Sequence, residues 1–133
     1  MPKLNSLLEI VLFVEDIARS KTFYKEVIGL PQSRDGVFVV AAGQLLLLAK
    51  HGTTDVPKQL PGGTIPTCGA LGSQQVAFAV SAADFESWRT HLIEHGLADL
   101  SEVQWERGGR SLYFRDPDAH LLELATPGVW EVY

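Results

Sequence analysis

Two segments of this chain resemble each other, and the repeat constrains the fold more than any other feature. Residues 9–14 read EIVLFV and residues 75–80 read QVAFAV, and each is a short strand-like run that stops at a helix start. Each copy resumes after a glycine as apolar strands, and the second copy ends in HLLELAT, residues 120–126. A duplicated unit predicts one shared cleft in which polar residues of both halves converge, first among them Glu9, Gln75 and Glu123.

Composition excludes several classes of protein. The chain has 133 residues, a usual length for one domain, and its net charge of -5 comes without a Lys/Arg cluster, which argues against a nucleic-acid partner. Cys68 is the only cysteine, so neither an internal disulfide nor a zinc thiolate site is expected. The longest near-apolar stretch, Val37–Ala49, is shorter than the roughly 18 residues of a membrane span, and the N-terminus lacks a signal-peptide pattern. We therefore expect a cytoplasmic protein without a membrane segment.

The first half of the chain reads as a strand, a helix and a hairpin. Glu9–Val14 is the strand, Asp16 is the predicted N-cap of the helix, and Gly29 is its predicted end. Val37–Ala42 and Leu45–Ala49 are expected to form a hairpin joined at Gly43-Gln44.

Residues 51–74 contain three prolines and five glycines and show no periodicity. They are expected to connect the halves, and a flap over a binding site is the alternative.

The second half repeats the order of elements. The strand Gln75–Val80 precedes a capping box at Ser81–Asp84 and a helix that ends at Gly96. Strands at 102–106 and 110–114 flank Gly108-Gly109, and the last strand is 120–125. The prediction is one domain, 1–133, with module one at about 7–50, a connector at 51–74, module two at 75–126 and a tail at 127–133.

Two stretches resemble a known family. VLFVEDIARSKTFYKEVIGL and RGGRSLYFRDPDAHLLELATPGVW look like signatures of the vicinal oxygen chelate superfamily, which includes glyoxalase I, extradiol dioxygenases, fosfomycin-resistance proteins and bleomycin-binding proteins. The resemblance covers roughly residues 7–130. It implies an α+β fold of two tandem βαβββ modules, whose mixed sheets form a cup with a divalent ion on its floor in metal-using members.

The resemblance also implies a set of metal ligands. Carried over by motif, they are Glu9, Gln75 and Glu123, whereas Leu47 occupies the position that matches Glu123 in module one and cannot ligate. Many relatives have His at the position of Gln75, so this set is unusual in being all oxygen. Oxygen ligands suit Mg²⁺ and Mn²⁺ and hold Ni²⁺, Zn²⁺ or Fe²⁺ less selectively. We expect a divalent metal of open identity, no organic cofactor, and Glu123 or Glu9 as a proton carrier.

Further residues are expected to line the cup. Alternation along the first strand places Phe13 on the face of Glu9, and Phe38 on a neighbouring strand is a second aromatic candidate. Resemblance to fosfomycin-resistance proteins places Tyr113 and Ser111 in the substrate site. If Gly108-Gly109 is a two-residue turn, residue 104 pairs with 113, which adds Gln104 to the same face. The alternative for Glu123 is an ion pair with Arg110 or Arg115.

These features favour a metal-dependent lyase or isomerase that acts on a small oxygenated molecule. The alternative is a non-catalytic protein that sequesters a drug or metabolite, of the bleomycin-resistance type. An extradiol dioxygenase is less favoured because it needs two histidine ligands, and none of the four histidines matches a ligand position. A homodimer is expected, with donation of Glu9 by the partner as one arrangement.

Overall fold

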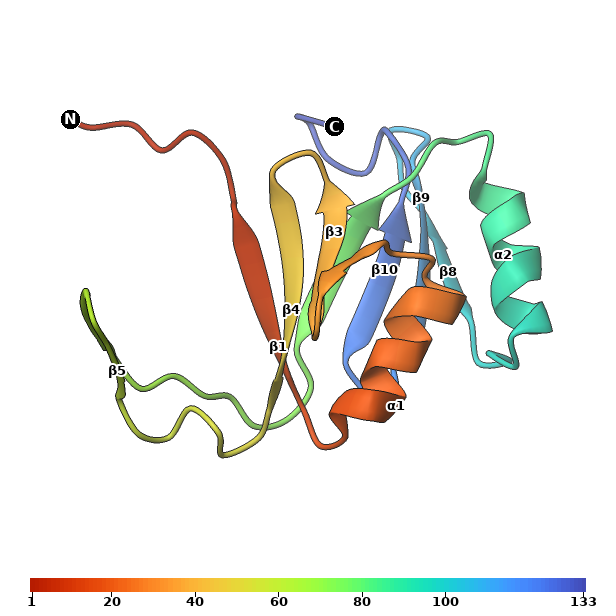
Figure 1. Ribbon diagram of the computed structural model, residues 1–133. Coiled ribbons are helices and arrows are strands. Elements are labelled where there is room, and N and C mark those ends of the chain that lie inside the picture. Colours follow the sequence, from red (N-terminus) through yellow and green to blue (C-terminus); the bar gives the residue numbers. More distant parts are fainter. The chain divides into compact units, whose positions relative to one another are not determined.

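The chain folds into two compact units that have the same arrangement of strands. The computed structural model describes residues 1–133 and divides them into Met1–Leu71 and Gly72–Tyr133. Each unit holds one four-stranded mixed sheet and its own helical segment (Figure 1). The α+β fold and its internal repeat, both predicted from the sequence, are therefore confirmed.

The first unit is built on the strand order β1-β4-β3-β2, with β1 parallel to β4 and the other pairs antiparallel. Its strands are β1 (Glu9–Val14), β2 (Gln32–Arg34), β3 (Val37–Ala41) and β4 (Gln44–Lys50). The helix α1 (Ile17–Thr22) continues into one π-helical segment, η1 (Phe23–Val27). Asp16 caps α1 as predicted, because its Oδ1 accepts the backbone N–H of Arg19 at 3.0 Å, and this bond lowers the pKa of the Asp16 carboxyl.

The second unit has the strand order β7-β10-β9-β8, again with one parallel pair, β7 with β10. Its elements are β7 (Gln75–Ala79), α2 (Phe85–Glu94), β8 (Ser101–Gln104), β9 (Arg110–Arg115) and β10 (Leu121–Ala125). Only half of the predicted capping box forms: Ser81 Oγ accepts the backbone N–H of Asp84 at 3.1 Å, but the Asp84 carboxylate accepts from the Ser81 hydroxyl at 2.6 Å. The helix itself begins at Phe85, after Asp84. Gly96 follows the helix with φ of +83°, as a helix-ending glycine should.

Three details of the first unit differ from the sequence-based prediction. The sequence pattern does not predict the bounds of the strand β2, and the β3–β4 turn is Ala42-Gly43, one residue earlier than expected. The connector was expected to lack regular structure, but it contains a hairpin of β5 (Lys58–Leu60) and β6 (Gly63–Ile65). This hairpin projects away from the four-stranded sheet of its unit (Figure 1), which explains why it shows no apolar alternation.

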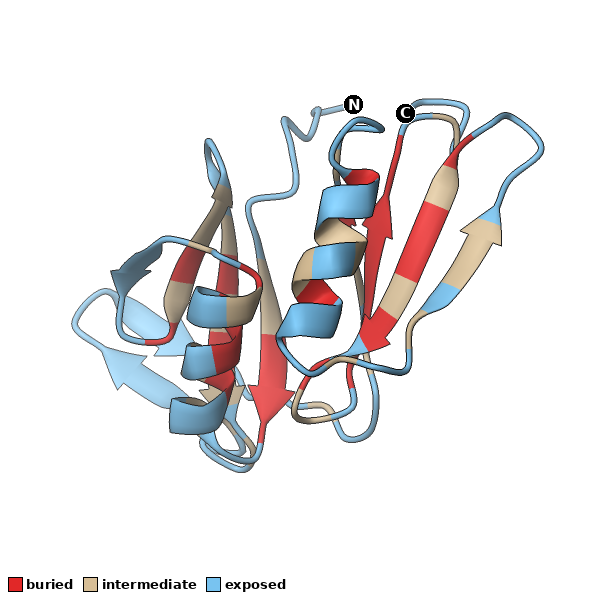
Figure 2. Ribbon diagram, turned by 90° about the vertical axis from the view of Figure 1, so that its right-hand side faces the viewer, coloured by how far each residue is buried: buried red, intermediate tan, exposed pale blue.

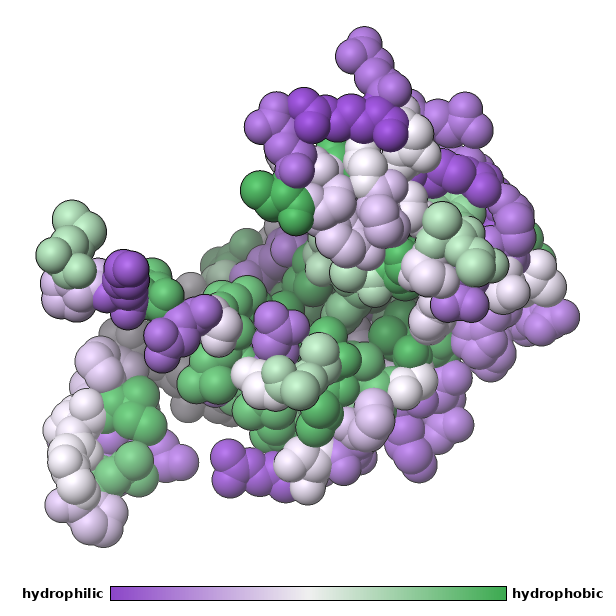
Figure 3. Space-filling model, turned by 90° about the horizontal axis from the view of Figure 1, so that it is seen from above, coloured by the Kyte–Doolittle hydropathy of each residue, from purple (hydrophilic) through white to green (hydrophobic).

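The core of each unit lies between the sheet and the helix that crosses one face of it (Figure 2). In the second unit, Leu112, Phe114, Leu122 and Leu124 point to the helix side, where Phe85 and Leu92 of α2 are also buried. None of the helices has the length and apolar character needed to span a lipid bilayer. Hydrophobic side chains also reach the surface in patches between polar ones (Figure 3).

The strand registers make the two copies comparable residue by residue. In the first unit Glu9 pairs with Leu45 and Val11 with Leu47. In the second unit Gln75 pairs with Leu121, and two residues further on Ala77 pairs with Glu123. Leu47 and Glu123 therefore occupy the same place in the two sheets. The second copy carries a carboxylate where the first carries an apolar side chain.

Candidate functional site

The face of the second sheet that lies away from α2 surrounds one buried carboxylate with small side chains. Strand alternation puts Glu123 on this face, between Ala77 of β7 and Tyr113 of β9. The next cross-strand row consists of Ala79, Ala125 and Ser111. The neighbours of Glu123 in this row and the next therefore include three alanines and a serine, and Glu123 itself is only 5% exposed.

The carboxylate of Glu123 is held by three uncharged donors. Oε1 accepts hydrogen bonds from Ser111 Oγ at 2.5 Å and from Tyr113 OH at 3.0 Å, and Oε2 accepts one from Gln75 Nε2 at 3.2 Å. No lysine, arginine or histidine pairs with it. A buried carboxylate usually has a cationic partner or a metal ion, so this arrangement leaves its charge uncompensated by the protein.

Tyr113 is half-buried beside this carboxylate. Burial raises the pKa of the Tyr113 phenol, and the neighbouring charge of Glu123 acts in the same direction. The hydroxyl therefore remains protonated around neutral pH and serves as a donor, both to Glu123 and to an oxygen atom of a ligand on this face.

Trp105 is part of the site although the sequence did not point to it. Its indole Nε1–H donates to Ser111 Oγ at 2.8 Å, which makes Trp105, Ser111 and Glu123 a continuous hydrogen-bonded chain. The predicted strand pairing was wrong: residue 103 pairs with 111 and residue 101 with 113. The connection is a five-residue loop, Trp105–Gly109, closed by a bond from the Trp105 N–H to the Gly109 carbonyl at 2.8 Å.

This shift of three positions exchanges the faces of β8, because an odd shift in register turns every side chain over. Gln104 pairs with Arg110 and lies on the helix side, away from Glu123. Its predicted place beside Tyr113 is therefore not found. Val103 and Trp105 lie two positions apart and therefore share one face of the strand. Which face they share can be predicted only once the length of the turn is known.

The arginines considered as partners of Glu123 are engaged elsewhere. Arg110 pairs with Glu86 and Glu102 at 2.6 and 2.7 Å, and its guanidinium lies 4.0 Å from the centre of the Phe85 ring. Arg115 donates to Ser73 Oγ and to the Ala119 carbonyl. Arg110 thus stabilises the packing of α2 on the sheet, and the predicted alternative of an ion pair with Glu123 is wrong.

The DPDAH segment, part of the family-like stretch, has a structural role. Asp116 Oδ1 accepts the backbone N–H groups of Asp118 and His120, both at 2.9 Å, and so shapes the turn before β10. The buried ring of His120 accepts the Gln74 N–H at 3.0 Å through Nδ1. These bonds hold the start of β7 beside the start of β10, which places Gln75 near Glu123.

The remaining predicted residues belong to the first unit. Glu9 is exposed at the start of β1, and Phe13 lies on the same face of that strand. Phe38 is completely buried on the opposite face, against Tyr24 at a ring separation of 6.2 Å. It was predicted to line the site, but its register with Leu46 makes it a core residue.

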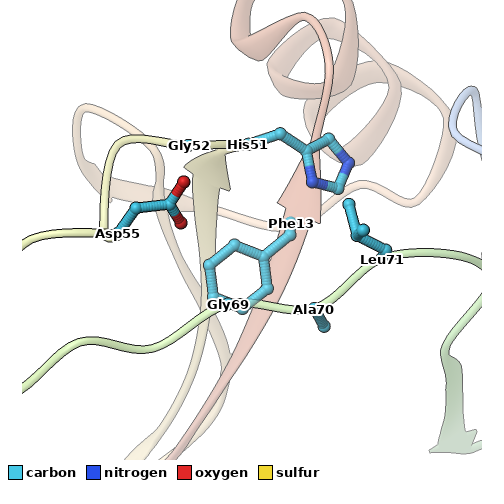
Figure 4. A pocket seen from close by; sticks show the side chains of 7 residues that line it. All are labelled: Phe13, His51, Gly52, Asp55, Gly69, Ala70 and Leu71. Carbon is cyan, nitrogen blue, oxygen red and sulfur yellow. The ribbon is translucent and has the colours of Figure 1, made fainter.

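Phe13 lines a pocket of about 310 Å³ in the first unit (Figure 4). Its ring stacks against His51 at 6.4 Å, and the carboxylate of Asp55 and the side chain of Leu71 complete the walls. The pocket is formed by β1, the turn after β4 and the end of the unit. Phe13 thus contacts a cavity of its own unit, and its predicted role in binding a substrate stays a prediction.

The oxygen donors around Glu123 fit a hard divalent cation in their chemistry. A buried carboxylate without a cationic partner lies next to an amide and a serine hydroxyl, which is the donor type that Mg²⁺ and Mn²⁺ prefer. The second unit provides only part of a ligand set, since no cluster of three or more His, Cys, Asp or Glu side chains is positioned to hold a metal ion.

Comparison with known proteins agrees with this fold. A family model described as glyoxalase/bleomycin resistance protein/dioxygenase superfamily matches residues 6–124. The chain belongs to this superfamily. The metallothiol transferase FosB of Staphylococcus haemolyticus is 31% identical over 117 residues, covering 85% of this chain and 77% of that protein. The glutathione transferase FosA of Serratia marcescens is 30% identical over 125 residues, covering 91% and 80%.

The fold of this superfamily member also resembles solved structures. The crystal structure of lactoylglutathione lyase from Agrobacterium tumefaciens aligns with a TM-score of 0.83 at 23% identity, covering 98% of this chain and 99% of that one. At this identity the likeness shows the fold alone. The functional argument for this member of the glyoxalase/bleomycin resistance protein/dioxygenase superfamily therefore rests on its own side chains.

Proposed function

We propose that this protein is a divalent-metal-assisted enzyme that acts on a small oxygenated molecule at the face of the second sheet. The observation that carries the proposal is the carboxylate of Glu123, which is buried, held by Ser111, Tyr113 and Gln75, and not neutralised by any cationic side chain. Membership of the superfamily and the names of the relatives, a metallothiol transferase and a glutathione transferase, support the same class of protein.

In this proposal Glu123 and Gln75 hold the cation through oxygen atoms, and Glu9 is the third protein ligand. The bound cation would act as a Lewis acid toward an oxygen of the substrate. Ser111 and Tyr113 both bind Oε1 of Glu123, so they fix the plane of the carboxylate and leave Oε2 to the weaker contact with Gln75. A rotation of the Gln75 amide frees Oε2 for the cation and presents the amide oxygen beside it.

The side chains also suggest how a substrate would be oriented. The Tyr113 hydroxyl can donate to a substrate oxygen, and Ala77 and Ala79 leave space for the body of the molecule. Glu123 is the one carboxylate on this face that can accept a proton from a carbon or hydroxyl of the substrate. This combination suits a lyase or an isomerase, and the relatives' names add transfer of a thiol as a related reaction class.

Metal binding is the first test. Chelator-treated protein should bind one Mn²⁺ per chain in calorimetric titration, and Glu123→Gln should weaken binding at least tenfold. Glu94→Gln, an exposed change on α2, is the matched control and should bind like the parent. Absence of binding of Mn²⁺, Mg²⁺ and Ni²⁺, or equal binding by Glu123→Gln, would refute the metal-assisted enzyme.

A thiol requirement separates the reaction classes. The metal-loaded protein should be incubated with small epoxides and α-oxoaldehydes, with and without a low-molecular-weight thiol. Opening of an epoxide only with the thiol, to a thioether that carries the new hydroxyl, indicates a transferase. Conversion of the hemithioacetal, formed from the α-oxoaldehyde and the thiol, to the isomeric thioester indicates a lyase or isomerase. Tight binding without any turnover would favour a sequestering protein. This is the second candidate function, because Glu9 and Gln75 stand at positions where many relatives have histidine.

We also propose that the protein is a homodimer. Its N-terminal segment exposes Leu4, Leu7 and Leu8, with Leu4 98% exposed, and such apolar side chains commonly mark an interface. Light scattering at micromolar concentration should give twice the chain mass. A monomer that binds Mn²⁺ normally would contradict the dimer and leave the metal-assisted activity intact.

A further inference from the structure

The second unit contains a cavity at the end of the β8–β9 hairpin that has no role in the function proposed above. It has a volume of about 510 Å³, within the usual range for small-molecule sites. This cavity, here called the Trp105 pocket, is lined by residues 103–107 on one side and by Gly128 and Val129 of the C-terminal segment on the other.

The walls of the Trp105 pocket are held in place by backbone contacts. The Trp105 N–H binds the Gly109 carbonyl at 2.8 Å, and the Gly108 N–H binds the Trp105 carbonyl at 2.9 Å. Gly109 lies so close to Gly128 that an added Cβ would come within 2.4 Å of its carbonyl carbon. The hairpin and the C-terminal segment are therefore packed together before any ligand arrives, which lowers the entropic cost of binding.

The chemistry of the Trp105 pocket favours a flat aromatic group without a negative charge, because Glu106 also lines it. Trp105 is 40% exposed, and Val103 and Val129 add apolar surface. Arg107 is paired with Glu131 at 2.6 Å, so the guanidinium does not present an uncompensated positive charge. An indole ring with apolar neighbours provides a stacking surface for another aromatic ring.

The orientation of that indole ring depends on the proposed reaction centre. Trp105 Nε1–H donates to Ser111 Oγ, and Ser111 donates to Oε1 of Glu123. This chain fixes the tilt of the ring, so the cavity and the carboxylate belong to one rigid arrangement.

We propose that the Trp105 pocket binds an aromatic portion of the substrate, while the oxygenated portion of the same molecule reaches Glu123. The placement of the oxygenated portion rests on the function proposed above. Trp105 is then both the platform for the aromatic group and a positioning residue that acts on Glu123 through Ser111.

The test uses indole as the probe and the full-length ¹⁵N-labelled protein in the presence of a chelator. Unlabelled indole should cause saturable shifts of the Trp105 side-chain N–H signal and of the backbone signals of Gly128 and Val129. Cyclohexanol, which is similar in size but neither flat nor aromatic, should cause no saturable shift at these positions. The Trp105 signal is assigned by its loss in Trp105→Phe.

Substitutions separate stacking from hydrogen bonding. Trp105→Ala should weaken indole binding at least tenfold, whereas Trp105→Phe, which keeps a ring, should weaken it less than threefold. Trp130→Phe, at an exposed tryptophan outside the cavity, should leave binding unchanged. The proposal is overturned if the indole shifts fall elsewhere, or if Trp105→Phe binds as poorly as Trp105→Ala.

The link to Glu123 has its own readout. Trp105→Phe removes the donor to Ser111 and should shift the Mn²⁺ dissociation constant by at least threefold, with Trp130→Phe unchanged. An unaltered constant would refute the positioning role. Because indole binding is measured without metal, failure of the Trp105 pocket and failure of the metal-assisted activity are separate outcomes.

Discussion

Removal of the Ser111 hydroxyl should lower the free energy of unfolding, and the hydrogen bonds of this hydroxyl set the size of the loss. Ser111 is completely buried, and its Oγ donates to the Glu123 carboxylate at 2.5 Å and accepts from Trp105 at 2.8 Å. A hydrogen bond to a charged group contributes about 1.5–3 kcal/mol to stability. Trp105 is 40% exposed, so its indole N–H can donate to water when Ser111 is removed, and the loss of this contact adds little. Ser111→Ala should therefore lower the free energy of unfolding by about 2 kcal/mol.

The assay is urea unfolding followed by far-UV circular dichroism, together with a thermal scan. For a chain of this size, about 2 kcal/mol corresponds to a fall in Tm of roughly 6–10 °C. Ser101→Ala is the matched control, because Ser101 is exposed on β8 opposite Tyr113 and forms no hydrogen bond through its side chain. It should stay within about 0.5 kcal/mol of the parent.

A double-mutant cycle then assigns the effect to Glu123. In a Glu123→Gln background the acceptor is uncharged, so Ser111→Ala should cost only about 1 kcal/mol. If Ser111→Ala matches Ser101→Ala, or if its cost is the same in both backgrounds, the carboxylate is not stabilised by this hydroxyl and the site geometry derived above is incorrect.

Three further predictions concern Tyr113, Gly109 and Asp16. The folded-state pKa of Tyr113 lies above its unfolded value near 10.0, so the stability that this phenol contributes is present below pH 10 and is lost as the pH rises through the folded pKa. Tyr113→Phe should therefore reduce the fall of the urea midpoint at alkaline pH. Gly109→Ala would place a Cβ 2.3 Å from the Val129 nitrogen and should cost about 1–3 kcal/mol, whereas Gly62→Ala, with open space around it, should be neutral in the same urea assay. Asp16→Ala removes the cap of α1 and should cost about 1 kcal/mol by urea unfolding, whereas Asp16→Asn should retain most of the stability.

Much of the fold could be predicted because local signals agreed with the repeat. Asp16 and Gly29 bound the first helical segment, Asp84 and Gly96 bound the second, and the alternation in EIVLFV and QVAFAV predicts the correct faces for Glu9 and Gln75. The equivalence of Leu47 with Glu123 also followed from aligning two short strands. These features depend on neighbours in sequence, which is why one chain was enough to find them.

The site was less predictable because it depends on strand register. Gly108-Gly109 was interpreted as a two-residue turn, but Gly109 is needed for its close approach to Gly128, which lies 19 positions away in sequence. That single misreading put Gln104 in the site and left Trp105 out. Phe38 was misplaced for a similar reason, since its face depends on pairing with Leu46 and not on its aromatic character.

The parallel pairing of β7 with β10 has a consequence for how the protein folds. Ser111 and Tyr113 lie on a hairpin strand next to β10 and can meet Glu123 through short-range pairing, whereas Gln75 reaches Glu123 only when the two ends of the second unit come together. Contacts between residues distant in the chain close late, because loop-closure entropy opposes them. The hydroxyl side of the carboxylate should thus assemble early in refolding and the amide side last. Recovery of cation binding after denaturation would then lag behind recovery of the β-sheet signal and would report completion of the native state.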